Sequence, residues 1–186
     1  AGDRTTPFGV PGGGDPVLTA QGLAMPADPA EGATQSGLTA CADAAWRLYA
    51  LGAGDRYLEL AERTMEAVAG IATERPIAFG GALELMSKLA SPLVQLVTVL
   101  PDGDGDGGVH GAGAQGEVAA ATRRHAASVS TIVTERQARE FAAAGFELFE
   151  GRGVQSGAPT AYRCRSFVCA LPVNSASELE ALVEPA

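Results

Sequence analysis

The hydrophobic pattern of this chain of 186 residues changes its period at Ser91-Pro92. Upstream, from residue 34 to residue 91, apolar residues recur at the three- and four-residue spacing of amphipathic helices. Downstream, residues 93–100 are nearly all apolar or β-branched, which is typical of a strand buried on both faces. The chain is therefore predicted to be α+β, with a helical segment at 34–91 and a small α/β segment at 92–186.

The helical segment is predicted to form a hairpin of two helices, followed by a third helix. A hydroxyl at Thr34 or Ser36 is expected to cap the first helix, and Asp55 is expected to cap a second at 56–73. The short Leu-Gly-Ala-Gly connection before Asp55 predicts an antiparallel αα-hairpin. Pro76 is expected to end this hairpin, and a third helix follows near 78–90.

Residues 1–33 contain many Gly and Pro residues, so they are predicted to form an irregular arm with at most a short strand at 17–20. In the α/β segment, a helix near 115–126 lies between the strand at 93–100 and a second strand at 129–133. This order predicts a right-handed βαβ unit in a mostly parallel sheet. The remaining expected elements are a helix at 136–144, strands at 147–150 and 161–168, and a last helix that starts at Ser175 or Ser177 and runs to Val183.

Composition limits the classes of function. The formal net charge is −9, with 13 Lys and Arg against 22 Asp and Glu, so binding to the phosphates of nucleic acids is disfavoured. No apolar run approaches the length of a membrane span, and we expect no membrane partner. Three cysteines are too few for a disulfide scaffold, which favours a reducing compartment and a cytoplasmic location.

Gly111, Gly113 and Gly116 match the G-x-G-x-x-G pattern of dinucleotide-binding proteins, and the pattern opens a helix that a strand follows. In such proteins the first Gly makes the tight turn at the end of the strand. Here the residues 101–110 separate the strand from Gly111, which favours a Gly-rich loop over a cofactor site. Nucleotide binding through this loop remains an alternative function, and the main interpretation requires no cofactor.

Asp102, Asp104 and Asp106 have the spacing of the first three ligands of a calcium loop. The twelfth position of such a loop should be a bidentate Glu, yet Gly113 stands there. The preceding element is also expected to be a strand rather than a helix. A solvated surface loop is therefore the favoured interpretation, with a metal site as its alternative.

Cys164 and Cys169 lie five residues apart, and in one straight strand they would face opposite sides. A disulfide between them requires a turn at 165–167, because the two Cα atoms must approach within about 7 Å. Arg163 and Arg165 could lower the pKa of a thiol. The favoured interpretation is two ordinary thiols on different sides of a closing strand. The spacing is not C-x-x-C, so thioredoxin-type redox chemistry is not encoded here.

Two stretches together resemble the C-terminal end of the spermatogenesis-associated thioredoxin-like family. The first is Glu31-Gly32-Ala33-Thr34-Gln35-Ser36-Gly37, followed by a helical hairpin that contains Gly54-Asp55-Arg56-Tyr57-Leu58-Glu59-Leu60-Ala61-Glu62-Arg63. The second is Gly157-Ala158-Pro159-Thr160-Ala161-Tyr162-Arg163-Cys164-Arg165-Ser166-Phe167-Val168-Cys169-Ala170-Leu171-Pro172-Val173. The residues that carry the resemblance most directly are Ser36, Gly37, Tyr162, Cys164, Cys169 and Pro172.

Members of that family pair an N-terminal thioredoxin-like domain with an (α/α)6 toroid of the six-hairpin glycosidase type. The resemblance implies that the helices of 34–91 are the end of such a toroid, and that the chain is a C-terminal fragment or a trimmed relative. It implies a carbohydrate-related role by fold analogy, with a small carbohydrate or the missing N-terminal part as partner, and it identifies no catalytic residue. The alternative from a different class is a non-catalytic interaction or homo-oligomerisation module.

Overall fold

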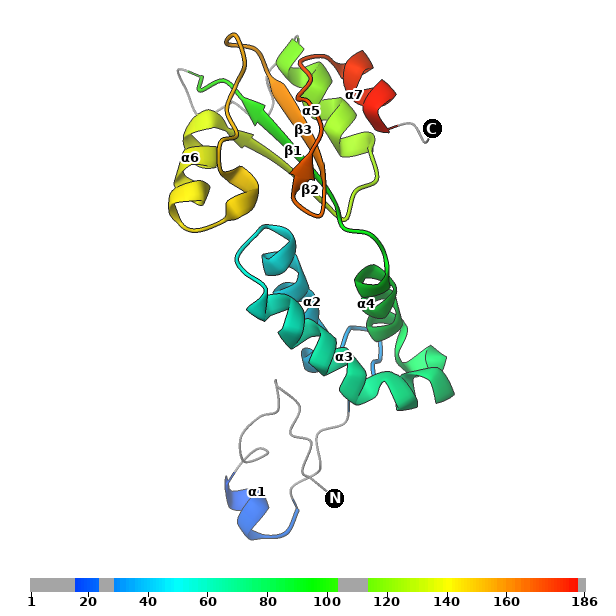
Figure 1. The fold of residues 1–186 in the computed structure, drawn as a ribbon. Helices are drawn as coiled ribbons and strands as arrows, with labels where there is room; N and C mark the ends of the chain where they lie inside the picture. The colour runs from blue at the N-terminus through cyan, green and yellow to red at the C-terminus, as the bar shows by residue number, and fades with distance from the viewer. Residues whose placement is uncertain (1–15, 24–28, 104–113, 184–186) are drawn as a thin grey trace. The chain divides into compact units, whose positions relative to one another are not determined.

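The computed structural model describes residues 16–23, 29–103 and 114–183 (Figure 1). Its internal contacts divide the chain into two units. Unit 1 comprises Ala1–Tyr49 and Gly54–Ser91, and unit 2 comprises Ala50–Ala53 and Pro92–Ala186. Helices make up the regular structure of unit 1 as described, whereas unit 2 is built on a four-stranded sheet, so the chain is α+β as predicted.

The regular elements of unit 1 are α1 (Pro16–Ala20), α2 (Gly37–Ala50), α3 (Arg56–Glu74), the 3-10 helix η1 (Pro76–Ala78) and α4 (Gly80–Ala90). Ser36 Oγ accepts a hydrogen bond from the Thr39 amide at 3.1 Å, which confirms the predicted cap of α2. After the turn at 51–54, α3 runs back in the direction opposite to α2 (Figure 1). The core of the unit is small and rich in alanine, and its larger buried side chains are Trp46, Met65, Val68, Phe79 and Leu85.

Two local predictions in unit 1 are wrong. The segment 17–20 is helical rather than extended, because Pro16 has the backbone angle that a first helical residue needs and Gly22 follows the helix with φ +71°. Asp55 precedes α3 but makes no side-chain capping bond. Its own backbone is already helical, at φ −61° and ψ −27°, whereas a capping side chain requires an extended residue.

The sheet of unit 2 contains β1 (Val94–Leu100), β2 (Val129–Thr134), β3 (Thr160–Arg165) and β4 (Val168–Cys169), in the order β2-β1-β3-β4. Helix α5 (Ala114–Arg124) connects β1 to β2, and these two strands are parallel, which confirms the βαβ unit. The expectation of a mostly parallel sheet is wrong, because β3 is antiparallel to both β1 and β4. A two-residue turn between β3 and β4 can join only antiparallel strands.

Helices cover both faces of this sheet (Figure 1). Helix α6 (Glu135–Ala143) and the 3-10 helix η3 (Glu147–Phe149) pack on one face, where Val97 and Val99 of β1 join the buried Leu148 and Phe149. Helices α5 and α7 (Ala176–Val183) cover the other face, where Leu96 of β1 meets Val118 and Leu179. Alternate residues of β1 therefore serve two separate cores, as expected of a strand buried on both faces.

The predicted strand at 147–150 is wrong, because this segment forms η3. The amide of Glu147 donates to Gly52 O at 3.2 Å and that of Leu148 donates to Leu51 O at 3.3 Å. A Cβ atom on Gly52 would lie 2.9 Å from the Glu147 amide nitrogen, and Gly52 has φ +85°, so glycine permits this close approach. These contacts account for residues 50–53 belonging to unit 2.

The last helix, α7, begins where the sequence indicates. Ser175 Oγ accepts from the Glu178 amide at 3.3 Å, and the Glu178 carboxylate accepts from the amides of Asn174 and Ser175 at 3.1 Å each. The hydrogen bond from the Ser175 hydroxyl, with those two amides, keeps the pKa of Glu178 below its ordinary value. Within the described ranges, no helix combines the length and the apolar character that a membrane span requires.

Candidate functional site

The tail of the chain forms a hairpin closed by a disulfide. Strand β3 turns at Ser166 and Phe167, which have φ +47° and +67°, and returns as β4. Cys164 and Cys169 are register partners across this hairpin and are bonded to each other, with their Cα atoms 3.8 Å apart. The interpretation of two free thiols on different sides of one strand is therefore wrong. The required turn exists, and five residues of separation bring the cysteines across the hairpin rather than along a strand.

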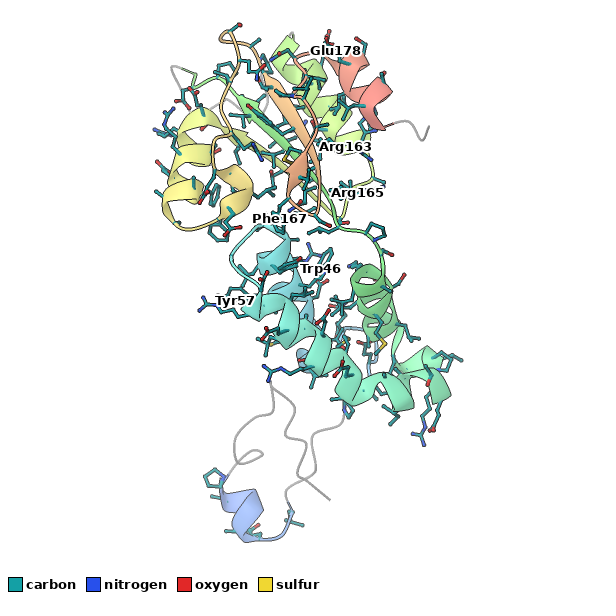
Figure 2. All side chains as sticks on the ribbon, viewed as in Figure 1. Trp46, Tyr57, Arg163, Arg165, Phe167 and Glu178 are labelled. Atoms are coloured by element: carbon teal, nitrogen blue, oxygen red, sulfur yellow. A yellow bond between two sulfur atoms is a disulfide. The ribbon has the colours of Figure 1, made fainter. Side chains whose placement is uncertain are left out.

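Arg152 and Tyr162 attach the neighbouring loop to this hairpin. The guanidinium of Arg152 lies over the Tyr162 ring at 5.1 Å, and its Nη2 donates to Cys169 Sγ at 2.8 Å. The Tyr162 hydroxyl donates to Gly153 O at 2.7 Å. Pro172 follows β4, and the next residue, Val173, exchanges two backbone hydrogen bonds with Ala161. Figure 2 shows Arg163, Arg165 and Phe167 in order along the hairpin towards its turn.

Gln95 connects the hairpin turn to the segment 50–53. It lies on β1 and is fully buried, with 0% exposure. Its Oε1 accepts from the Phe167 amide at 2.9 Å, and its Nε2 donates to Ala50 O at 2.8 Å. Both halves of the side-chain amide are therefore satisfied by backbone groups, as a buried Gln requires.

The residues Ser36 and Gly37, which carry the first half of the resemblance, belong to unit 1, whereas Tyr162, Cys164, Cys169 and Pro172 belong to unit 2. The stretch that contains Ser36 is held against the start of α4. Glu31 Oε2 accepts from the Gly81 amide at 2.6 Å, and the Glu31 amide donates to Ala78 O at 2.8 Å. These two hydrogen bonds hold the segment before α2 against η1 and the start of α4.

The Gly/Asp loop is described only at its start. Asp102 Oδ1 accepts from the Arg136 amide at 2.8 Å, and Oδ2 accepts from Arg139 Nη2 at 3.1 Å. The backbone hydrogen bond from Arg136, together with Arg139, holds the pKa of Asp102 below its ordinary value. This carboxylate is thus engaged at the start of α6 instead of being free for a cation. Of the other candidate residues, Gly116 lies in the first turn of α5, and Asp104, Asp106, Gly111 and Gly113 lie outside the described residues.

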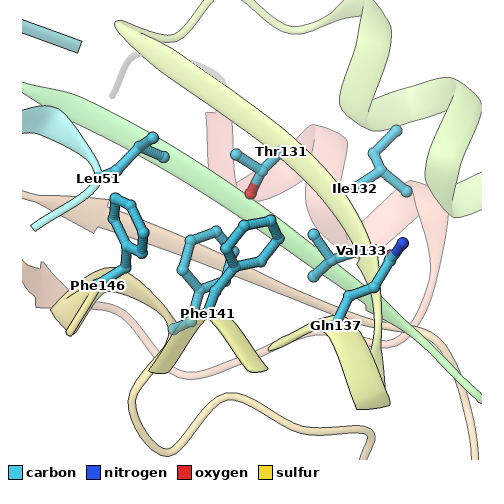
Figure 3. A pocket seen from close by; sticks show the side chains of 8 residues that line it. Leu51, Thr131, Ile132, Val133, Gln137, Phe141 and Phe146 are labelled. Atoms are coloured by element: carbon cyan, nitrogen blue, oxygen red, sulfur yellow. The ribbon is translucent and has the colours of Figure 1, made fainter. Parts of the chain in front are cut away.

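A pocket of about 390 Å³ opens on the α6 face of the sheet in unit 2 (Figure 3). Strand β2 forms one wall, and α6 and the segment that contains η3 form the other. Its apolar lining consists of Leu51, Ile132, Val133, Phe141, Phe146 and Phe149, and its polar lining consists of Thr131 and Gln137. Phe141 stacks on Phe149 with their centroids 5.0 Å apart, and it meets Phe146 edge-on at 5.9 Å.

The two polar side chains of the pocket differ in their bonding. Gln137 belongs to the capping box of α6, where its Oε1 accepts from the Thr134 amide at 2.9 Å. Thr131 Oγ1 is buried and has no hydrogen-bond partner within the described chain. Figure 3 shows this oxygen on the side of Thr131 that faces the phenylalanine rings. Among the lining residues, the polar groups are the Thr131 hydroxyl and the Gln137 amide, and none carries a charge.

Sequence reasoning did not find this pocket. The sequence does contain one indication of an aromatic site. Three of the six phenylalanines, Phe141, Phe146 and Phe149, lie within nine residues. No protein-family model, curated protein or solved structure matches this chain.

Proposed function

We propose that this chain is the C-terminal part of a larger protein similar to the spermatogenesis-associated thioredoxin-like family, in which it has a non-catalytic, structural role. In this proposal α2, α3 and α4 are the last helices of an (α/α)6 toroid, and unit 2 follows it. The antiparallel pair α2 and α3 is the kind of hairpin from which such a toroid is built.

The observation that carries the proposal is the structure of the tail. The stretch at 157–173 contains the β3-β4 hairpin, which the bond between Cys164 and Cys169 closes. Tyr162 and Cys169 also hydrogen-bond to the loop at 152–153. Cys164 is 1% exposed and Tyr162 is 6% exposed, so these side chains are packed against the core instead of facing a substrate. A motif with this geometry marks a structural closing element.

A carbohydrate-related activity would belong to the toroid. The pocket of unit 2 offers six apolar side chains and two polar ones, whereas a sugar requires partners for many hydroxyl groups. Calorimetric titration of the longer protein with mono- and disaccharides tests this part of the proposal. Binding that survives mutation of the unit 2 pocket would support a site in the toroid, and an absence of binding would remove the carbohydrate role.

The alternative of an interaction module is favoured by the surface of the tail hairpin. Val168 is 78% exposed on β4, at the edge of the sheet, and Leu171 is 86% exposed just beyond it. Apolar side chains beside a strand edge can support pairing with another chain. Light scattering tests this alternative: a concentration-dependent dimer that Val168→Lys abolishes would support it, and a monomer at all concentrations would exclude self-association.

Nucleotide binding is the third candidate, because β1, α5 and β2 have the parallel βαβ topology of dinucleotide-binding units. The helix begins at Ala114, well beyond the end of β1 at Leu100, so the spacing that brings the first Gly to the strand end is not met. A thermal shift with dinucleotides would support this candidate, and its absence would remove it.

A further inference from the structure

We propose that the pocket between β2 and α6 is a binding site for a small, neutral aromatic molecule of one or two rings that carries one hydroxyl or N–H group. This inference concerns unit 2 alone and does not depend on the proposed kinship or on any carbohydrate activity.

The size and lining of the pocket determine the class of ligand. A volume of about 390 Å³ lies within the range of small-molecule sites. The aromatic wall is already arranged for stacking, because Phe141 and Phe149 are nearly parallel, with 28° between their planes, and Phe146 stands at 86° to Phe141. A flat ring can therefore meet both a ring face and a ring edge, the two geometries that aromatic pairs prefer.

Phe141 is the side chain that such a ligand would cover. It is 41% exposed although it takes part in the aromatic cluster, whereas Phe149 is 3% exposed. Covering exposed aromatic surface with an apolar ligand removes that surface from water, which favours binding. Because the described lining carries no charge, an ionised ligand would be desolvated without a partner, so the site favours a neutral one.

Thr131 supplies the polar selectivity. Its buried Oγ1 lacks a hydrogen-bond partner in the described chain, and it faces the aromatic rings across the pocket (Figure 3). A hydroxyl can both donate and accept, so a ligand with a single hydroxyl or N–H would satisfy it, whereas a pure hydrocarbon would leave it unpaired. Because this oxygen is already buried and unpaired in the unliganded structure, the hydrogen bond that the polar ligand gains discriminates between two ligands of the same shape.

Phenol and toluene are matched probes for this prediction, because both are single rings with one small substituent. Each is titrated into the intact chain while backbone amide chemical shifts are followed by NMR. We expect shifts concentrated at residues 131–133 and 141–149, and affinity for phenol roughly 3- to 10-fold higher than for toluene, the effect of one hydrogen bond.

Two variants and one control distinguish binding in the pocket from nonspecific binding. Thr131→Val removes the hydroxyl with little change in shape, so it should reduce phenol affinity to the level of toluene while leaving toluene binding intact. Phe141→Leu keeps the site apolar but removes the stacking ring, so it should weaken both probes. Thr73→Val makes the same chemical change on the exposed surface of α3 and should alter neither affinity.

The proposal would be overturned by failure of both probes to bind, or by shifts centred outside the pocket. Equal affinities for phenol and toluene that Thr131→Val does not change would overturn the assigned role of Thr131 and with it the class of ligand. Each variant is checked for a native amide spectrum, and Phe141→Leu supplies an independent reading if Thr131→Val fails to fold.

Discussion

Gln95 joins three parts of unit 2 through its buried side chain. Its side chain bonds the Ala50 carbonyl and the Phe167 amide at the same time, and these partners lie 45 and 72 residues away in sequence. A single buried amide thus holds the turn after α2 and the tail hairpin against β1. These two hydrogen bonds explain why a polar residue can stand at this buried position of a largely apolar strand.

Gln95→Leu keeps the approximate volume of the side chain but removes both hydrogen bonds. We expect a loss of about 2–4 kcal/mol in the free energy of unfolding, because two backbone groups lose their partner in the interior. Urea unfolding measures this loss. Gln155→Leu, at an exposed position, is the matched control and should change stability by less than about 0.5 kcal/mol. Equal effects of the two substitutions would show that the Gln95 bonds contribute nothing specific.

Asp43 on α2 is one carboxylate that contributes to the acid sensitivity of unit 1. Burial raises its pKa, but the hydrogen bond and charge of Arg47, with those of Lys88, outweigh burial and leave the pKa below its ordinary value. A carboxyl with a depressed pKa stabilises the folded state above its ordinary pKa of about 4, and this stabilisation is lost as the pH falls through the depressed value.

The melting temperature of the native chain should therefore fall more steeply between pH 5 and pH 3 than that of Asp43→Asn. In the free energy of unfolding, the pH-dependent stabilisation by Asp43 is expected to be below about 1 kcal/mol. Arg47 and Lys88 are partly exposed, so solvent screens their attraction to Asp43. Asp55→Asn, which removes a carboxylate that makes no capping bond, is the control and should follow the native profile. Parallel profiles for the native chain and Asp43→Asn would contradict the role given to Asp43.

At the scale of elements, the disulfide hairpin is the feature most open to a chemical test. Under denaturing conditions without reductant, an alkylating agent should modify one cysteine, Cys41, and after reduction it should modify all three. Mass spectrometry counts the adducts. Three adducts without reductant would show that the bond between Cys164 and Cys169 is absent from the protein.

Removing this bond should have a moderate effect on stability. The loop that it closes is short, so the chain-entropy estimate for Cys164→Ala with Cys169→Ala is a loss of about 2 kcal/mol. Urea unfolding of the double variant measures this loss. A loss well above that value would indicate that the cysteines also contribute strongly through packing in the core around Val97 and Phe149.

The sequence predicts an element well when the residues that determine it lie within the element or next to it. Strand β1, helix α5 and strand β2 follow from the apolar pattern of their own residues, and Ser36 caps α2 through an amide three residues away. The tail hairpin turns at Ser166 and Phe167, which adopt positive φ although neither is glycine. The Asn-Gly or Asp-Gly signal that usually marks such a turn is therefore missing from the sequence. The sequence therefore does not predict the antiparallel pair β3-β4 or the disulfide across it.

The pocket could not be predicted because its walls meet only in the folded unit. Thr131, Phe141 and Phe149 belong to three elements, and Leu51 comes from a turn that precedes the sheet in sequence. The same holds for Asp102, whose carboxylate joins the start of α6 from 34 residues away. The sequence can indicate a cluster of phenylalanines, but it cannot indicate the cavity that they line in the folded unit.

At the scale of the whole molecule, the chain combines a helical unit with a small α/β unit, and each has its own core. The disulfide in the second unit bears on the expected location. Stable disulfides are rare in reducing compartments, so the cytoplasmic location stays a prediction that the alkylation experiment, repeated on cell extracts trapped with acid, would test.

The central proposal is that α2, α3, α4 and the tail hairpin belong to the end of a protein with a thioredoxin-like domain and an (α/α)6 toroid. The most direct measurement is the coding sequence upstream of the codon for Ala1 in the same reading frame. The proposal predicts that this sequence encodes further helical hairpins and, before them, a thioredoxin-like domain. A reading frame that starts at this chain, or that encodes an unrelated domain upstream, would contradict it.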